Sequence, residues 1–125
     1  MSYVSGFVVP VGHGDKQAYV DAARKSWVLF KEYGALEHME AWEDNVPEGK
    51  ATDFFRAVDR QDGEIVVFSW ILWPDKATAD AGYARMMDDP RMKDMDMPFD
   101  GKRMIYGGFQ PVFFASAEGG EEAAP

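Results

Sequence analysis

The chain contains no cysteine and only two histidines. The absence of cysteine excludes disulfide bonds, a thiol nucleophile, zinc held by cysteine and an iron–sulfur cluster. No apolar run reaches the roughly 18 residues of a membrane span, and the opening MSYVSGFVVP lacks a basic segment followed by a long apolar one. We therefore expect a cytoplasmic protein that does not cross a membrane.

Positive charge is also scarce: 13 lysines and arginines stand against 22 acidic residues, and the net charge is −9. Proteins that bind phosphate backbones or anionic membranes usually concentrate lysine and arginine on one face. The composition therefore argues against nucleic acid as a partner.

The length of 125 residues suits one domain with a core of its own. We assign residues 1–115 to a single domain. Residues 116–125 read SAEGGEEAAP, without an aromatic or β-branched residue, and are expected to form a disordered acidic tail.

Periodicity predicts seven elements along the chain. Strands are expected at 3–11, 35–43, 53–59, 64–73 and 103–115, and helices after the capping residues Asp15 and Asp75, ending at Gly34 and Met87. The runs 53–59 and 64–73 flank Arg60-Gln61-Asp62-Gly63 and are predicted to form a hairpin. The stripe Val20, Ala23, Trp27 and Phe30 is expected to be the buried face of the first helix.

This order is typical of an α+β, ferredoxin-like fold, a split βαβ antiparallel sheet with two helices on one face. The strand 64–73 is apolar on both faces, and the chain has no third layer to cover the second. We therefore predict that two sheets pack face to face in a homodimer, as a dimeric α+β barrel.

Three motifs, Val67-Phe68-Ser69-Trp70, Asp89-Pro90-Arg91-Met92 and the run from Phe99 to Phe109 (FDGKRMIYGGF), carry a family resemblance. With the opening Tyr3–Pro10 and the 34–53 stretch, the chain resembles the YbaA-like family of bacterial domains of unknown function between Tyr3 and Val112. The resemblance implies a dimeric ferredoxin-like α/β barrel, related in shape to small antibiotic-biosynthesis-type monooxygenases, and no established activity.

His38 is the better placed of the two histidines, because it lies two residues from Glu40 on a predicted strand. Both side chains therefore share a face, where an imidazole and a carboxylate could exchange a proton with a substrate. The alternative is a partly exposed pair without a catalytic role. His13 lies between glycines and reads as a solvated turn residue.

Further candidates line a predicted ligand pocket. Arg56 has the parity of Phe54 and Val58, so it would be an inward cation in a salt bridge or a ligand clamp. Arg103 could receive an anion, and Trp27, Trp42 and Trp70 could line a cleft for a flat apolar ligand. No P-loop, GxGxxG or HExxH motif occurs, so we expect neither a metal nor a cofactor.

Three functions remain open at this point. The first is a homodimer that binds an apolar or aromatic small molecule. The second is a cofactor-independent monooxygenase or isomerase in which His38 acts as the base, and the third is an interaction module that associates with RNA.

Overall fold

The computed structural model describes residues 1–123. Its elements, in chain order, are β1 (Tyr3–Gly12), the 3₁₀ helix η1 (His13–Asp15), α1 (Lys16–Glu32), β2 (Glu37–Trp42), α2 (Phe54–Ala57), β3 (Glu64–Trp73), α3 (Lys76–Asp88), α4 (Pro90–Lys93), β4 (Ile105–Phe109), β5 (Phe113–Ala115) and β6 (Glu121–Ala123).

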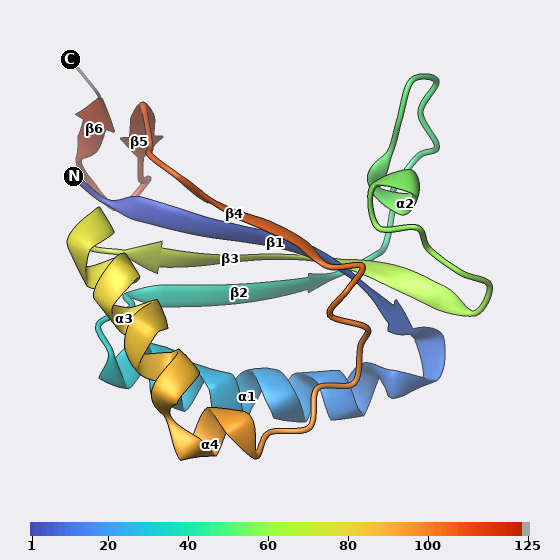
Figure 1. The fold of residues 1–125 in the computed structure, drawn as a ribbon. Helices are drawn as coiled ribbons and strands as arrows, with labels where there is room; N and C mark the ends of the chain where they lie inside the picture. The colour runs from blue at the N-terminus through green and yellow to red at the C-terminus, as the bar shows by residue number, and fades with distance from the viewer. Residues whose placement is uncertain (124–125) are drawn as a thin grey trace.

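Four strands form one antiparallel sheet in the order β2-β3-β1-β4. Helices α1 and α3 lie on one side of this sheet (Figure 1). The predicted ferredoxin-like α+β fold is therefore confirmed. β2 and β4 are the two outer strands, so each has one backbone edge without a partner strand within residues 1–123.

The predicted strand at 53–59 is wrong, because this segment forms the short helix α2. Asp53 has extended backbone angles, and its carboxylate accepts the Arg56 N–H at 2.8 Å, which starts a helical turn. Phe55 and Val58 then pack against Val66 and Val8 on the sheet side opposite α1 and α3. The sheet therefore has four strands, and the expected hairpin between 53–59 and 64–73 does not form.

The predicted final strand at 103–115 is divided. β4 ends at Phe109, and Pro111, which has no N–H to donate, separates it from β5. β5 pairs with β6 in a separate two-stranded ladder, with Phe114 opposite Glu122. The structure thus differs from the expected disordered tail at residues 121–123; residues 124–125 lie outside the described residues.

The helix boundaries follow local signals. The Asp75 carboxylate accepts the Thr78 N–H at 2.7 Å and caps α3 as predicted, whereas η1 precedes α1 and Asp15 makes no capping hydrogen bond. Gly34 has a φ of +108° just after α1, the left-handed conformation expected at a helix end.

The main core lies between the helices and the sheet, around Leu29, Phe30, Ile71 and the fully buried Trp73. The buried stripe of α1 differs from the prediction by one position. It comprises Tyr19, Ala22, Ser26, Leu29 and Phe30, while Val20 is exposed and Trp27 is partly so. This shift places Tyr19 inside the fold.

The opposite face of the sheet is largely open in a single chain. Apart from the end beneath α2, it presents Met39 on β2, Phe68 on β3, and Ile105 and Phe109 on β4, each more than 40% exposed. This open face matches the prediction that β3 is apolar on both sides.

Candidate functional site

His38 and Glu40 come from β2 and point toward the helices. In the register of the sheet, His38 lies opposite Ile71 and Glu40 opposite Ser69, two buried residues of β3 that also face the helix layer. The two-residue spacing brings both side chains to one face, as the sequence predicted, and the structure shows that this is the face toward the helices.

The two side chains are in direct contact. His38 Nε2 lies 2.5 Å from Glu40 Oε2, and Tyr19 donates its hydroxyl proton to Glu40 Oε1 at 2.6 Å. The His38 side chain is 7% exposed and that of Glu40 is 24% exposed. Tyr19, Glu40 and His38 thus form a hydrogen-bonded chain that links α1 to β2.

Sequence reasoning did not find Tyr19. Tyr19 and Glu40 are 21 positions apart in the sequence, and no periodic pattern relates a helix residue to a strand residue at that separation. Burial, followed by the Glu40 carboxylate, raises the pKa of Tyr19 far above its ordinary value, so the phenol remains a proton donor. The available signal was the alternative stripe of Tyr19, Ala22, Ser26 and Leu29 at helical spacing.

Aromatic rings hold the imidazole in place. The ring centroid of Phe30 lies 5.3 Å from that of His38 with an edge-to-face orientation, and the Trp27 centroid lies 6.2 Å away. Such packing restricts the rotation of the imidazole, so its nitrogens keep fixed directions.

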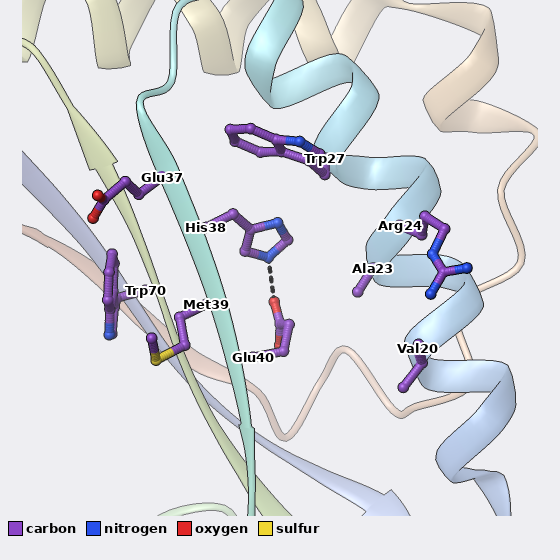
Figure 2. Close-up of a pocket in the computed structure, with 9 residues that line it drawn as sticks. All are labelled: Val20, Ala23, Arg24, Trp27, Glu37, His38, Met39, Glu40 and Trp70. Atoms are coloured by element: carbon purple, nitrogen blue, oxygen red, sulfur yellow. Dashed lines mark hydrogen bonds and ion pairs between the residues drawn. The ribbon is translucent and has the colours of Figure 1, made fainter.

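Two hollows meet at the His38–Glu40 pair. The outer cleft, with a volume of about 600 Å³, opens between α1 and the free edge of β2. Figure 2 shows its nine lining residues, with Val20, Ala23, Arg24 and Trp27 on α1, across the cleft from His38 and Glu40 on β2. The inner cavity, of about 180 Å³, lies between the helices and the sheet. His38 and Glu40 line both spaces.

The inner cavity is mostly apolar. Its floor includes Phe7, Val9 and Ile71 from the sheet, and five of the eight methionines of the chain, Met86, Met87, Met92, Met97 and Met104, form much of its wall. Methionine side chains are flexible and make favourable contacts with aromatic rings. The cavity therefore offers an adaptable apolar wall on one side and the His38–Glu40 pair on the other.

The three predicted tryptophans are not together. Trp27 lines the outer cleft beside His38, whereas Trp70 borders the cleft from the other face of the sheet, next to Met39 (Figure 2). Trp42 packs on Tyr19 with ring centroids 6.3 Å apart and belongs to the core around Val67. Only Trp27 is therefore placed against the imidazole.

Arg56 lies on α2 rather than on a strand, and its side chain is half exposed. It donates to the carbonyl oxygens of Gly49 at 2.9 Å and Lys50 at 3.2 Å and pairs with Asp53 at 3.5 Å. These bonds fold the long connection between β2 and β3 onto itself. The prediction of an inward cation is wrong, because the strand on which it depended does not exist.

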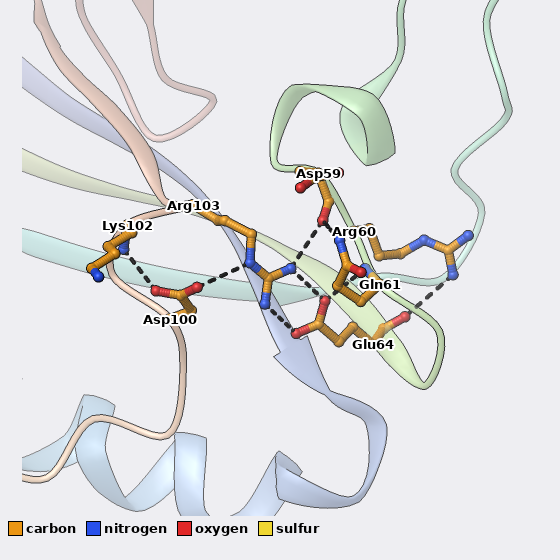
Figure 3. Close-up of polar contacts among 7 residues, drawn as sticks. All are labelled: Asp59, Arg60, Gln61, Glu64, Asp100, Lys102 and Arg103. Atoms are coloured by element: carbon orange, nitrogen blue, oxygen red, sulfur yellow. Dashed lines mark hydrogen bonds and ion pairs between the residues drawn. The ribbon is translucent and has the colours of Figure 1, made fainter.

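Arg103 lies at the far end of the sheet from His38 and joins three segments (Figure 3). It makes two bonds to the Glu64 carboxylate at 2.7 and 2.8 Å, one to Asp100 at 3.1 Å and one to the Asp59 carbonyl at 2.9 Å. Arg103 holds the pKa of the Glu64 carboxyl below its usual range. Its donors are thus directed to protein acceptors, which accounts for the Asp-Gly-Lys-Arg motif as a structural clamp.

Two further observations concern the described part of the chain. Within residues 1–123, no three histidine, aspartate or glutamate side chains are grouped closely enough to hold a metal ion. Over the same residues, no helix is both long and apolar enough to span a membrane.

Comparisons with known proteins give one family and one fold. The model of the family described as "Protein of unknown function (DUF1428)" matches residues 2–101. The proteins named "Uncharacterized protein YbaA" from Escherichia coli K12 and Shigella flexneri are each 54% identical over 114 residues, which cover 90% of this chain and 97% of theirs.

Among solved structures, a crystal structure of a dimeric ferredoxin-like protein from an uncultured marine organism superposes with a TM-score of 0.50. The two chains are 15% identical, and the match covers 87% of this chain and 92% of the other. At that identity the likeness concerns the fold alone.

Proposed function

This chain belongs to the DUF1428 family of proteins of unknown function, and from its site we propose that it binds a small, single-ring aromatic molecule in the inner cavity. The family membership confirms the resemblance read from the sequence. The observation that carries the proposal is the half-open, mostly apolar inner cavity, with its methionine wall and with His38 and Glu40 among its few polar lining residues.

The size of the cavity supports a ligand of one ring. An apolar cavity of about 150 Å³ accommodates benzene, and the inner cavity here measures about 180 Å³. Its thioether groups favour an aromatic ring over an aliphatic one. The position of His38 and Glu40 favours one polar substituent on that ring, which would face the pair.

Calorimetric titration with phenol tests this proposal. We expect saturable binding with a Kd below about 1 mM, and weaker binding of cyclohexanol, which has the hydroxyl but not the aromatic ring. An absence of saturation by phenol in that range, or equal affinity for the two compounds, would contradict it.

A variant that fills the cavity locates the binding. Ser69 is buried on the cavity floor opposite Glu40, so Ser69→Leu places apolar atoms in the space that the ring would occupy. We expect this variant to lose phenol binding while its thermal midpoint is kept or raised. Ser116→Leu, at an exposed position outside both hollows, is the matched control. Unchanged binding in folded Ser69→Leu would exclude the inner cavity as the site.

We also propose that the chain acts as a homodimer joined through the open face of its sheet. Support comes from the exposed apolar residues of that face, since soluble monomers rarely expose a large contiguous apolar patch. The ferredoxin-like neighbour is described as dimeric, which is consistent with this arrangement.

Light scattering coupled to gel filtration tests the dimer. Phe68 is 47% exposed at the middle of the open face, so Phe68→Glu should shift the mass from twice 14.1 kDa to a single chain. Val28→Glu is the matched control, because Val28 is 56% exposed on α1, away from that face. A wild-type protein that elutes as a monomer would refute the dimer.

A further inference from the structure

The hydrogen-bonded chain at the cavity has a direction. Tyr19 is the donor to Glu40 Oε1, and Glu40 Oε2 is left to accept from His38 Nε2. A carboxylate that accepts from one imidazole nitrogen fixes the tautomer, because the proton must sit on that nitrogen. The other nitrogen, Nδ1, then carries a lone pair and can accept a proton.

Nδ1 lies on the side of the ring that faces α1. Figure 2 shows the Nε2 side of the ring facing Glu40 and the other ring nitrogen facing α1, between Trp27 and Ala23. Among residues 1–123, the imidazole makes one hydrogen bond, through Nε2. His38 lines both the outer cleft and the inner cavity, so a molecule held in either space lies beside its imidazole.

We propose that His38 accepts a proton from a phenolic ligand at this site, with Glu40 and Tyr19 as positioning residues. The inference rests on the proposed function, since it needs an aromatic ligand in the cavity. The ligand O–H bond breaks, an N–H bond forms at Nδ1, and the electron pair remains on oxygen as a phenolate. The step requires neither oxidant nor reductant.

Each residue of the hydrogen-bonded chain Tyr19–Glu40–His38 has a distinct role. Glu40 accepts the hydrogen bond from Nε2–H throughout, without taking the proton, and its negative charge stabilises the imidazolium that forms. Tyr19 holds the second oxygen of Glu40, which fixes the carboxylate in the plane that reaches Nε2. Phe30 and Trp27 limit the motion of the imidazole.

Other titratable groups near His38 have to be distinguished from it. Arg24 and Tyr19 lie on α1, Tyr83 of α3 lines the inner cavity, and Glu37 borders the outer cleft from the other face of the sheet (Figure 2). Arg24 is the one permanent cation among these groups, and it could stabilise a phenolate by charge alone. The experiment therefore includes its removal.

The probe is 4-nitrophenol, because its phenol and phenolate forms have different absorption spectra. We expect the bound dye to ionise at a pH about 1 to 3 units below that of the free dye, since a cation beside it favours the anion. His38→Gln should abolish this change. His13→Gln is the matched control, because His13 is the other histidine and lies exposed in η1.

Four further variants, one of them a control, separate the roles. Glu40→Gln should remove the effect while leaving dye binding in place, and Tyr19→Phe should reduce it. Tyr106→Phe, at a 74% exposed tyrosine, is the control for loss of a phenol group. An effect that survives His38→Gln or disappears in Arg24→Gln would overturn the proposal in favour of simple charge stabilisation. An unchanged effect in Tyr19→Phe would overturn the positioning role of Tyr19.

The two proposals fail differently. If 4-nitrophenol binds but its spectrum follows the free dye at every pH, the proton-acceptor role of His38 is refuted and ligand binding stands. If neither phenol nor 4-nitrophenol binds, the proposed function itself is refuted.

Discussion

The hydroxyl of Tyr33 donates a 2.5 Å hydrogen bond to the buried carboxylate of Asp89. Tyr33 follows α1, and Asp89 is the capping residue between α3 and α4, so the bond ties the ends of two helices together. Arg91 completes the cluster with bonds to Asp89 at 2.7 Å and to Glu32 at 2.5 Å. The Asp-Pro-Arg-Met motif therefore has a structural role beside the methionine wall.

This cluster predicts a pH-dependent contribution to stability. Arg91, followed by Tyr33, holds the pKa of Asp89 well below its usual range. In the unfolded chain an aspartate titrates at about pH 4, so the contribution is complete above that pH and is lost as the pH falls toward the lower value of the folded state. Urea denaturation should show Asp89→Asn destabilised at neutral pH, with the gap to wild type closing below about pH 4.

Asp88→Asn, at the exposed neighbouring position, should behave like wild type in the same titration. A gap for Asp89→Asn that stays constant down to about pH 2 would show that the carboxylate is not the source.

Gly82 on α3 packs against the buried indole of Trp73. A β-carbon at position 82 would lie 2.8 Å from two ring atoms of Trp73, too close for an ordinary contact. We expect Gly82→Ala to lower the free energy of unfolding by about 1–3 kcal/mol through overpacking, which outweighs the gain in helix propensity. Gly101→Ala, where nothing lies within 4 Å, should change it by less than about 0.5 kcal/mol. Equal values for the two variants would contradict this packing.

Val58 anchors α2 to the open side of the sheet. It is 1% exposed and packs with Val8 and Val66. Val58→Ala should cost about 1–3 kcal/mol of unfolding free energy in chemical denaturation, whereas Val112→Ala, at a 73% exposed position, should be neutral within about 0.5 kcal/mol. A neutral Val58→Ala would mean that α2 does not pack where the structure has it.

Arg103→Lys tests the clamp between β3 and the segment before β4. A lysine ammonium cannot reproduce the paired bonds to both Glu64 oxygens together with those to Asp100 and the Asp59 carbonyl. We expect a lower thermal midpoint and faster amide exchange over residues 59–64. Lys102→Gln, at the exposed neighbour, should change neither quantity, and a change of equal size there would point to net charge instead.

The sequence was informative where a local pattern decides the structure. The apolar run from Glu64 to Trp73 is β3 with the predicted bounds, and the spacing of His38 and Glu40 placed both on one face. The sequence led to wrong predictions where one pattern is compatible with two structures. Phe54 and Phe55 resemble a strand, but the Asp53 cap starts a helix there, and on α1 two adjacent stripes both have helical spacing.

The tertiary partners could not be predicted. Nothing in the neighbourhood of Tyr19 indicates that its hydroxyl meets Glu40, and Arg103 and Glu64 are 39 positions apart. Such pairs depend on how the helices cross the sheet, which is settled by packing over the whole core rather than by local propensity.

The location of the site on an outer strand has one more consequence. His38 and Glu40 belong to β2, whose backbone has a neighbouring strand on one side only within residues 1–123. A polypeptide that paired with the free edge of β2 would also cover the entrance beside Trp27. Entry of a small molecule into the cavity and pairing of an additional strand with β2 would therefore exclude each other.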